Sequence, residues 1–301
     1  MRPTPLLPVR LWRARTSYLM LLPTFALLLV FNYYPALRGL LYAFQKVSPG
    51  ISSEWVGLTN FRRMTEDYIL LQSIGNMLIL VAGNLAKSIV LPLLIAKLIA
   101  SVLNARHRYL FQTLFLFPIV VPGMVGIMLW KGFIYDANVG LINQTLGALG
   151  FERAARTVWL DHTHALGAII FTGFPWVGGI GFLIFLAGLL SIPISLTEAA
   201  RIDGATWMSI FRRVELPLII GQIKLVVILT FIGTMQDFGQ ILVMTQGGPG
   251  TSTHVPALHM YYMGFRFDHF GYAAAIGLVL FVVVLGATIL NMRFIRSGTE
   301  Y

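Results

Sequence analysis

Three polar residues, Thr230, Thr234 and Asp237, recur at spacings of four and three residues inside an otherwise apolar run. In an α-helix these positions lie on one face, so the spacing predicts two hydroxyls and a carboxylate that point in one direction. Such groups are the hydrogen-bond partners that the hydroxyls of a sugar need. The pattern also suits a hydrogen-bond network between membrane helices, so a substrate-binding face and a structural network both stay open.

Other residues in the apolar segments could also contact a substrate or carry charge. Trp176 could stack on the face of a pyranose ring, although a tryptophan near the end of a span also suits the membrane interface. Lys87 lies near the middle of an apolar run, where ionisable side chains usually indicate function, and it could face a cavity, a partner subunit or Asp237. Lys224 lies seven residues beyond Pro217, and we expect its side chain to extend to the membrane surface.

Between two long apolar runs lies the charged stretch TEAARIDGATWMSIFRRVELP, in a chain that is only 11% charged. Ser195 and Glu198 fit a capping box, with Thr197 as a competing N-cap. This pattern predicts a short helix from Glu198 to Asp203. Gly204 then fits the break that commonly follows the end of a helix.

A second short helix is predicted after this break. Its apolar face is formed by Trp207, Ile210, Phe211 and Val214, at spacings typical of one helix face. Pro217 then opens the next apolar span, where a proline in the first turn is tolerated. Helices of about two turns are marginal in water, so this pair must dock on something. The membrane surface, the chain's own helix ends and a cytoplasmic partner all remain open as docking sites.

The elements that must position these residues are membrane-spanning helices. The 301 residues are 57% hydrophobic with a mean hydropathy of +0.77, more apolar than a soluble domain of this size. Runs of about 20 apolar residues cross a bilayer as helices, and the alternating pattern of a barrel is missing. We predict an all-α membrane protein in which residues 1–301 form one domain, with spans at about 18–44, 73–102, 110–130, 165–190, 218–245 and 271–292.

The distribution of charge predicts which side of the membrane each loop faces. With a cytoplasmic N-terminus, the inner segments hold twelve basic and four acidic residues, a net charge of +8, whereas the outer segments hold seven of each. Basic residues concentrate on the cytoplasmic side of membrane proteins. We therefore expect both termini and the loop at 195–217 in the cytoplasm. The basic balance of the chain needs no nucleic acid as a partner.

Several stretches together resemble one family of transport proteins. EAARIDGAT and the later LP resemble the EAA loop of binding-protein-dependent ABC importers, in the form found in maltose-type carbohydrate permeases. RYLFQTLFLFPIVVPGMVGIMLW, TQGGPGTST and FDHFGYAAAIGLVLF resemble further segments of these permeases, in the same order. The chain looks most similar to the shorter, six-span sugar permeases of ABC importer type I.

The resemblance implies a function as well as a fold. The chain would be the permease subunit of an ATP-driven importer for a sugar or oligosaccharide, a multi-pass protein of the bacterial inner membrane. Its partners would be membrane lipid, a second, homologous permease subunit, two cytoplasmic ATPase subunits and an extracytoplasmic sugar-binding protein. It would not be an enzyme and would bind no cofactor, because ATP and Mg²⁺ bind to the ATPase subunits.

The resemblance also assigns roles to residues of this chain. The EAA loop would form a coupling helix that docks in a cleft of an ATPase subunit. The residues implied in coupling are Glu198, Ala199, Ala200, Asp203, Gly204, Leu216 and Pro217. Those implied in the substrate pathway are Thr230, Thr234 and Asp237, and we add Trp176 to this pathway because its ring could stack on a sugar.

The alternative function is a secondary transporter driven by an ion gradient, in which Lys87 and Asp237 would form a proton or ion site. The segment Asp161-His162-Thr163-His164 has metal-ligand residue types, but no further ligand set is visible, so we predict no metal site. There is no Walker A or dinucleotide-binding motif. The chain has no cysteine, which excludes disulfides and thiolate metal sites.

Overall fold

The computed structural model describes residues 15–47, 53–174 and 179–294. Apart from one two-stranded hairpin, the regular elements in these ranges are helices. In chain order they are α2 (Arg15–Leu28), η1 (Leu29–Tyr33), α3 (Tyr34–Tyr42), β1 (Gln45–Lys46), β2 (Glu54–Trp55), α4 (Thr59–Glu66), α5 (Tyr68–Ala100), α6 (Ala105–Leu116), η2 (Phe117–Val120), α7 (Gly123–Leu129), η3 (Trp130–Ile134), α8 (Leu141–Ala148), η4 (Ala154–Arg156), α9 (Ala165–Phe171), α10 (Ile180–Leu190), α11 (Ile194–Ile202), α12 (Trp207–Ile210), η5 (Phe211–Glu215), α13 (Leu216–Leu218), α14 (Ile220–Gln236), α15 (Gly239–Met244), α16 (Pro256–Phe265) and α17 (Phe270–Phe294).

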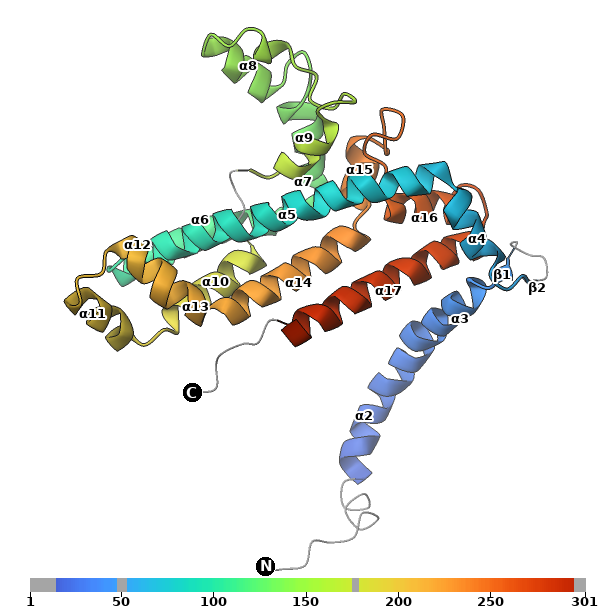
Figure 1. The fold of residues 1–301 in the computed structure, drawn as a ribbon, viewed down its shortest axis with the longest axis horizontal. Coiled ribbons are helices and arrows are strands. Elements are labelled where there is room, and N and C mark those ends of the chain that lie inside the picture. The colour runs from blue at the N-terminus through green and yellow to red at the C-terminus, as the bar shows by residue number, and fades with distance from the viewer. Residues whose placement is uncertain (1–14, 48–52, 175–178, 295–301) are drawn as a thin grey trace, which may run out of the picture.

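The helix α5 is the centre of the molecule (Figure 1). Its 33 residues correspond to about 50 Å at 1.5 Å per residue, enough to cross a bilayer and extend beyond it. Asp67 begins it as the N-cap, because its side chain accepts a hydrogen bond from the Leu70 backbone amide. The helices α9, α10, α14 and α16 pack against it. The hairpin β1–β2, in which Gln45 lies opposite Trp55, joins α3 to α4 before α5 begins.

Three helical stretches in the described ranges are long and apolar enough to cross a membrane: residues 15–42, 68–100 and 270–293. Three bent helix pairs bring the total to six if each is counted as one span. The apolar surface is extensive, and no residue of α2 is buried. Because lipid is as apolar as these side chains, their exposure is expected in a membrane protein. The predicted all-helical membrane fold is confirmed.

The third predicted span is sharply bent. The sequence predicts one helix over 110–130, but the stretches Ala105–Val120 and Gly123–Ile134 meet at 86°. Pro118 and Pro122 lie at this bend. A proline lacks the amide hydrogen that continues a helix and fixes its own φ, so two of them within five residues end one helix and start another.

The fourth and fifth spans also differ from single straight helices. The predicted fourth span is divided between α9 and α10, and Thr172, Gly173 and Phe174 form a turn after α9. The fifth span begins at Ile220, after a bend of 69° that follows Leu218. The prediction that Pro217 opens this span is therefore wrong, because Pro217 lies in α13, the short helix before the bend.

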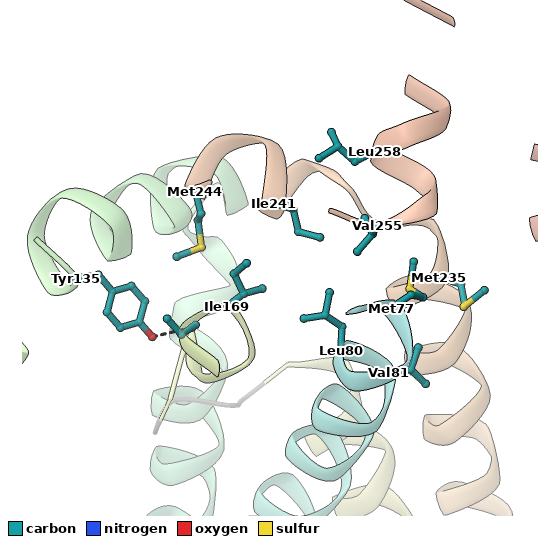
Figure 2. Packing of buried hydrophobic residues seen from close by; sticks show 11 residues of the cluster. Met77, Leu80, Val81, Tyr135, Ile169, Met235, Ile241, Met244, Val255 and Leu258 are labelled. Atoms are coloured by element: carbon teal, nitrogen blue, oxygen red, sulfur yellow. Dashed lines mark hydrogen bonds between the residues drawn. The ribbon is translucent and has the colours of Figure 1, made fainter. Parts of the chain in front are cut away.

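The core is divided into two clusters along α5. One joins α5 to α9, α15 and α16 through eleven buried residues that include Met77, Leu80, Ile169 and Met244 (Figure 2). Tyr135 belongs to the same cluster, and its hydroxyl donates to the Ala168 carbonyl at 2.8 Å. The second cluster includes Ala96 of α5, Phe182 and Phe185 of α10, Phe211 of η5 and Val226 of α14. This second cluster therefore fastens the charged loop to the bundle.

Candidate functional site

The first half of the charged loop is an exposed helix. Helix α11 has no buried residue, and Ile202 near its end is 87% exposed. Ile194 and Leu196 of the same helix are also exposed, so α11 presents several apolar side chains on its surface. Figure 1 shows α11 at the left edge of the molecule, next to α12.

The predicted capping box at the start of this helix is wrong. The helix begins at Ile194 after Pro193, and no side chain caps it. Ser195 is therefore already inside the first turn, where it cannot serve as the N-cap. The hydroxyl of Thr197 donates back to the Ile194 carbonyl at 2.8 Å.

The predicted helix end at Gly204 is confirmed. Gly204 has a φ of +77°, a conformation that residues with a Cβ rarely adopt. Its amide donates to the Arg201 carbonyl, and the next amide, of Ala205, donates to Ala200. These two bonds form a Schellman motif, which closes the helix and turns the chain toward α12.

The second half of the loop is held by packing and by an N-cap. Thr206 caps α12, because its hydroxyl accepts a hydrogen bond from the Ser209 amide at 3.3 Å. Of the predicted apolar face, Ile210 and Phe211 are buried, whereas Trp207 is 43% exposed. The loop thus docks on the ends of the chain's own helices and leaves α11 free on the surface.

A buried ion pair adds a second fastening that the sequence analysis did not identify. Lys97 of α5 donates to Glu215 of η5 at 2.6 Å, and both side chains are about 10% exposed or less. The Lys97 ammonium also lies 5.2 Å from the centre of the Trp207 ring, in range of a cation–π contact. The Trp207 indole donates to Ser101 at 3.4 Å. No short sequence pattern signals a pair whose members are 118 residues apart.

A central pocket of about 480 Å³ lies beside α5, α10 and α14. Its lining includes Lys87, Ser88, Thr172, Ile184, Leu229 and Thr230. The Lys87 ammonium donates to the carbonyl of Ile170 at 2.6 Å, in the last turn of α9, and to that of Thr172 at 3.2 Å, the residue that follows this helix. A lysine at this position compensates the partial negative charge of a helix C-terminus.

The predicted polar face of the fifth span is only partly formed. Thr230 lines the pocket, and Thr234 accepts a hydrogen bond from Asn84 of α5 at 3.3 Å. Asp237 does not share this face, because α14 ends at Gln236 and the Asp237 backbone is extended. Its carboxylate is exposed and accepts from the Gly239 amide at 2.9 Å, as in a turn between α14 and α15.

The remaining predicted polar contacts have other partners or lie elsewhere. Lys87 bonds to backbone carbonyls and not to Asp237. Lys224 donates to the Met292 carbonyl near the end of α17 at 3.1 Å, consistent with the predicted extension toward the membrane surface. Trp176 lies outside the described residues. Asp161 accepts from the amides of Thr163 and His164 and so closes a turn.

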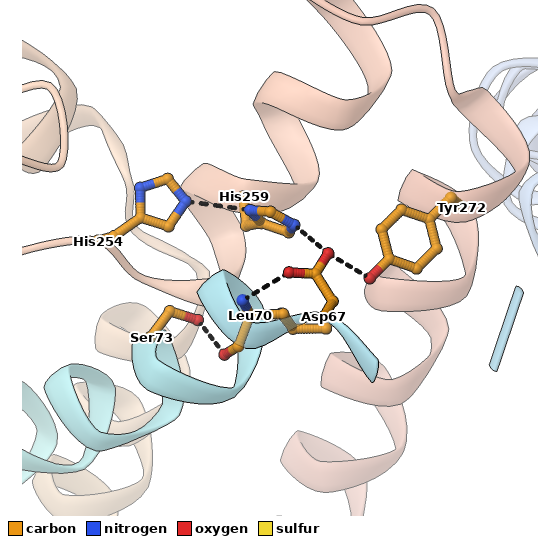
Figure 3. A network of polar contacts seen from close by, with 6 residues as sticks. All are labelled: Asp67, Leu70, Ser73, His254, His259 and Tyr272. Atoms are coloured by element: carbon orange, nitrogen blue, oxygen red, sulfur yellow. Dashed lines mark hydrogen bonds and ion pairs between the residues drawn. The ribbon is translucent and has the colours of Figure 1, made fainter. Parts of the chain in front are cut away.

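A polar network fastens the other end of the bundle (Figure 3). The Asp67 carboxylate accepts hydrogen bonds from Tyr272 of α17 at 2.8 Å and from His259 of α16 at 3.0 Å. His259 in turn contacts His254 at 3.2 Å. The Arg63 guanidinium lies 4.2 Å from the centre of the Tyr272 ring. The network links α5, α16 and α17. Sequence analysis counted Arg63 and Asp67 only as charges of an outer segment and did not single out the other members.

Two pKa values in this network depart from their ordinary values. Burial and the neighbouring His259 lower the pKa of His254 to about 4, against a smaller opposing effect of Asp67. Burial alone would raise the pKa of Asp67, but hydrogen bonds from Leu70, Tyr272 and His259 outweigh it and lower the pKa. At neutral pH Asp67 is therefore ionised and His254 is neutral.

The family model described as "Binding-protein-dependent transport system inner membrane component" matches residues 88–297. The chain belongs to this family. The permease is 34% identical over 291 residues to the sn-glycerol-3-phosphate transport system permease protein UgpA of Yersinia pestis, covering 94% of this chain and 95% of that protein. It is 30% identical over 274 residues to the multiple sugar-binding transport system permease protein MsmF of Streptococcus mutans, covering 89% and 91%.

A solved structure is also similar to the permease. It is the crystal structure of a bacterial alginate ABC transporter in complex with a periplasmic protein that holds an alginate pentasaccharide. The TM-score is 0.82 at 25% identity, with 97% of this chain and 99% of that chain covered. The resemblance to ABC importer permeases and the type I permease fold are therefore confirmed, and the ion-gradient alternative is not supported.

Proposed function

We propose that the permease conducts a sugar or oligosaccharide across the bacterial inner membrane in an ATP-driven importer. The names of two similar proteins support the substrate class, since one is a multiple-sugar permease and the other an alginate importer. A second permease subunit, two ATPase subunits and an extracytoplasmic sugar-binding protein complete the assembly. ATP and Mg²⁺ bind to the ATPase subunits, and this chain itself catalyses no reaction.

The proposal rests on the exposure of α11 and on the firm packing of the segment after it. We call this segment, α12 with η5, the base of the loop. Glu198 and Ala199 are exposed, while Phe211 and Glu215 of the following segment are buried against α5. An ATPase subunit that moves α11 would therefore move α5 with it, because the base cannot slide without breaking a buried ion pair. Such a rigid-body transmission is a known form of conformational switching. In this proposal the loop lies in the cytoplasm, as the charge balance indicates.

The substrate pathway in this proposal passes through the central pocket. Thr230 offers a hydroxyl there, and Thr234 lies one helical turn farther along α14. Asp237 lies at the break after α14, where its exposed carboxylate could meet a substrate as it enters from the outside. Movement of α5 would reshape the pocket directly, because Lys87 and Ser88 belong to this helix and line it.

Reconstitution of the full importer in liposomes tests the proposal. We expect Glu198→Lys to leave the permease inserted but to lower uptake of the sugar at least tenfold, because the carboxylate offered to a basic residue of the partner becomes a charge that repels it. Lys46→Glu, a charge reversal in the outer hairpin, is the control and should transport normally. Normal uptake by Glu198→Lys would contradict the proposed coupling role. Uptake that follows an ion gradient and ignores ATP would contradict the importer.

A further inference from the structure

Lys87 differs from the other residues of the central pocket in its charge. Among the described residues that line the pocket it is the only ionisable one, and the remainder are apolar, glycine, proline or hydroxyl-bearing. Its ammonium group lies near the middle of the 33-residue helix α5. A cation at this depth in a membrane protein requires compensation from its surroundings.

The partners of Lys87 in the described structure compensate it only in part. An ammonium group has three donors, and the carbonyls of Ile170 and Thr172 accept two hydrogen bonds from it. These carbonyls carry partial negative charge, and no carboxylate of the described residues lies within ion-pair distance of Lys87. Within the part of the chain that the structure describes, one donor and most of a unit positive charge therefore have no partner and are available to a molecule in the pocket.

Hydroxyl groups accompany this charge. Ser88 follows Lys87 on α5 and lines the pocket, and Thr230 of α14 lines it as well. The volume of about 480 Å³ lies in the range typical of small-ligand sites. A ligand that satisfies all these groups carries hydroxyls and one anionic group.

We propose that Lys87 makes the central pocket selective for an acidic sugar or a sugar phosphate, whose anionic group it binds. This inference rests on the proposed function as a sugar importer and specifies its substrate class. The competing account gives Lys87 a purely structural role, as the residue that holds the last carbonyls of α9 beside α5. In that account the charge of the pocket has no effect on what enters it.

The absence of cysteine from the chain allows the charge of the pocket to be measured directly. Thr230→Cys places one thiol in the pocket, and the importer is assembled with the other subunits in variants whose cysteines have been replaced. The probes are the anionic sulfonatoethyl and the cationic trimethylammonioethyl methanethiosulfonates. Thr145→Cys, on the exposed outer helix α8, provides the reference ratio of the two rates.

We expect the anionic reagent to be favoured at Thr230→Cys, relative to Thr145→Cys, by about tenfold or more, since a unit charge that lines the same partly buried pocket acts strongly on a charged reagent. Lys87→Arg should keep this preference and Lys87→Gln should abolish it. An unchanged ratio in Lys87→Gln would overturn the proposal, because the ratio would then not come from Lys87.

A second measurement needs no change at Lys87 and so does not depend on whether its variants fold. Glucuronate and glucose differ only in a carboxylate in place of a hydroxymethyl group. Glucuronate should slow labelling of Thr230→Cys at concentrations at which glucose does not, and equal protection by both would overturn the proposal. ATP-driven uptake of sugar without any charge preference would leave the importer function intact and remove only this inference. A preference for the anionic reagent at Thr230→Cys, in an importer that takes up no sugar, would support this inference and contradict the importer function.

Discussion

At the residue scale, the pair Lys97–Glu215 is the contact on which the base of the loop depends most. Removing one member leaves a buried charge without its partner, which costs about 3–5 kcal/mol. We therefore expect Lys97→Met and Glu215→Leu each to lower the stability of the assembled importer strongly. The double variant should recover most of the loss, because an apolar pair of similar volume can replace a buried ion pair. Thermal unfolding of the four proteins in detergent measures the cycle.

The control for this cycle is the exposed pair Arg62–Glu66, whose side chains are 84% and 68% exposed. Exposed pairs contribute about 0–1 kcal/mol, so Arg62→Met should change the unfolding temperature little. If Lys97→Met also left the unfolding temperature nearly unchanged, the buried pair would not hold the loop.

The lowered pKa of His254 predicts how the free energy of unfolding depends on pH. Its folded-state pKa of about 4 lies below the ordinary value of 6.5, so between these values only the unfolded chain binds the proton. The stabilisation is therefore complete above pH 6.5 and is lost as pH falls toward 4. The expected loss is on the order of 2 kcal/mol, since solvent screening reduces the value implied by the full shift.

Thermal unfolding at pH 7.5 and pH 5 checks this dependence. His254→Gln, which cannot gain a proton, should flatten it. Asp67 affects stability in a different pH range. Its pKa is lowered in the folded state, so its contribution to the free energy of unfolding is lost only below its ordinary pKa of 3.8. A pH dependence unchanged in His254→Gln would show that another group is responsible.

At the element scale, the Schellman motif at Gly204 fixes the direction in which α11 leaves the loop. Gly204→Ala forces a side chain into a positive-φ conformation at a cost of about 1 kcal/mol. We expect a small loss of stability and a several-fold loss of uptake per ATP hydrolysed, because α11 would no longer be held at one angle. Gly150 is a matched control with a φ of +86°, and at both glycines an added Cβ would meet no atom within 4 Å. Gly150→Ala should be destabilised by a similar amount and should transport normally.

The breaks between elements could be predicted from the sequence better than the contacts between distant elements. The break at Gly204 is readable because a glycine after a short helix signals its own local geometry. The bend at Pro118 and Pro122 is local too, although apolar length alone predicted one helix there. Asp237 was misplaced because helical spacing was extended past Gln236, where the helix ends. Contacts such as Asp67 with Tyr272, 205 residues apart, leave no local trace in the sequence.

At the scale of the whole molecule, the two ends of α5 should lie on opposite sides of the membrane. Leu103 follows one end and is 98% exposed, whereas Leu149 belongs to the outer segment after α8 and is 66% exposed. Single cysteines at these positions should react with an impermeant thiol reagent from opposite sides in intact cells and inverted vesicles. Labelling of both cysteines from one side would contradict the predicted topology, in which the inner segments carry a net charge of +8 and the outer segments carry none.

We expect an ATPase subunit to dock on α11, and cross-linking in the assembled importer can detect this contact. A bifunctional maleimide should join Ala199→Cys, on the exposed face of α11, to a single cysteine in the cleft of the ATPase subunit in the assembled importer. Thr145→Cys on α8 should give no such product. ATPase cross-linked from Ala199→Cys alone is the result that this account predicts. Equal cross-linking from both positions, or none from Ala199→Cys in an importer that still transports, would contradict it.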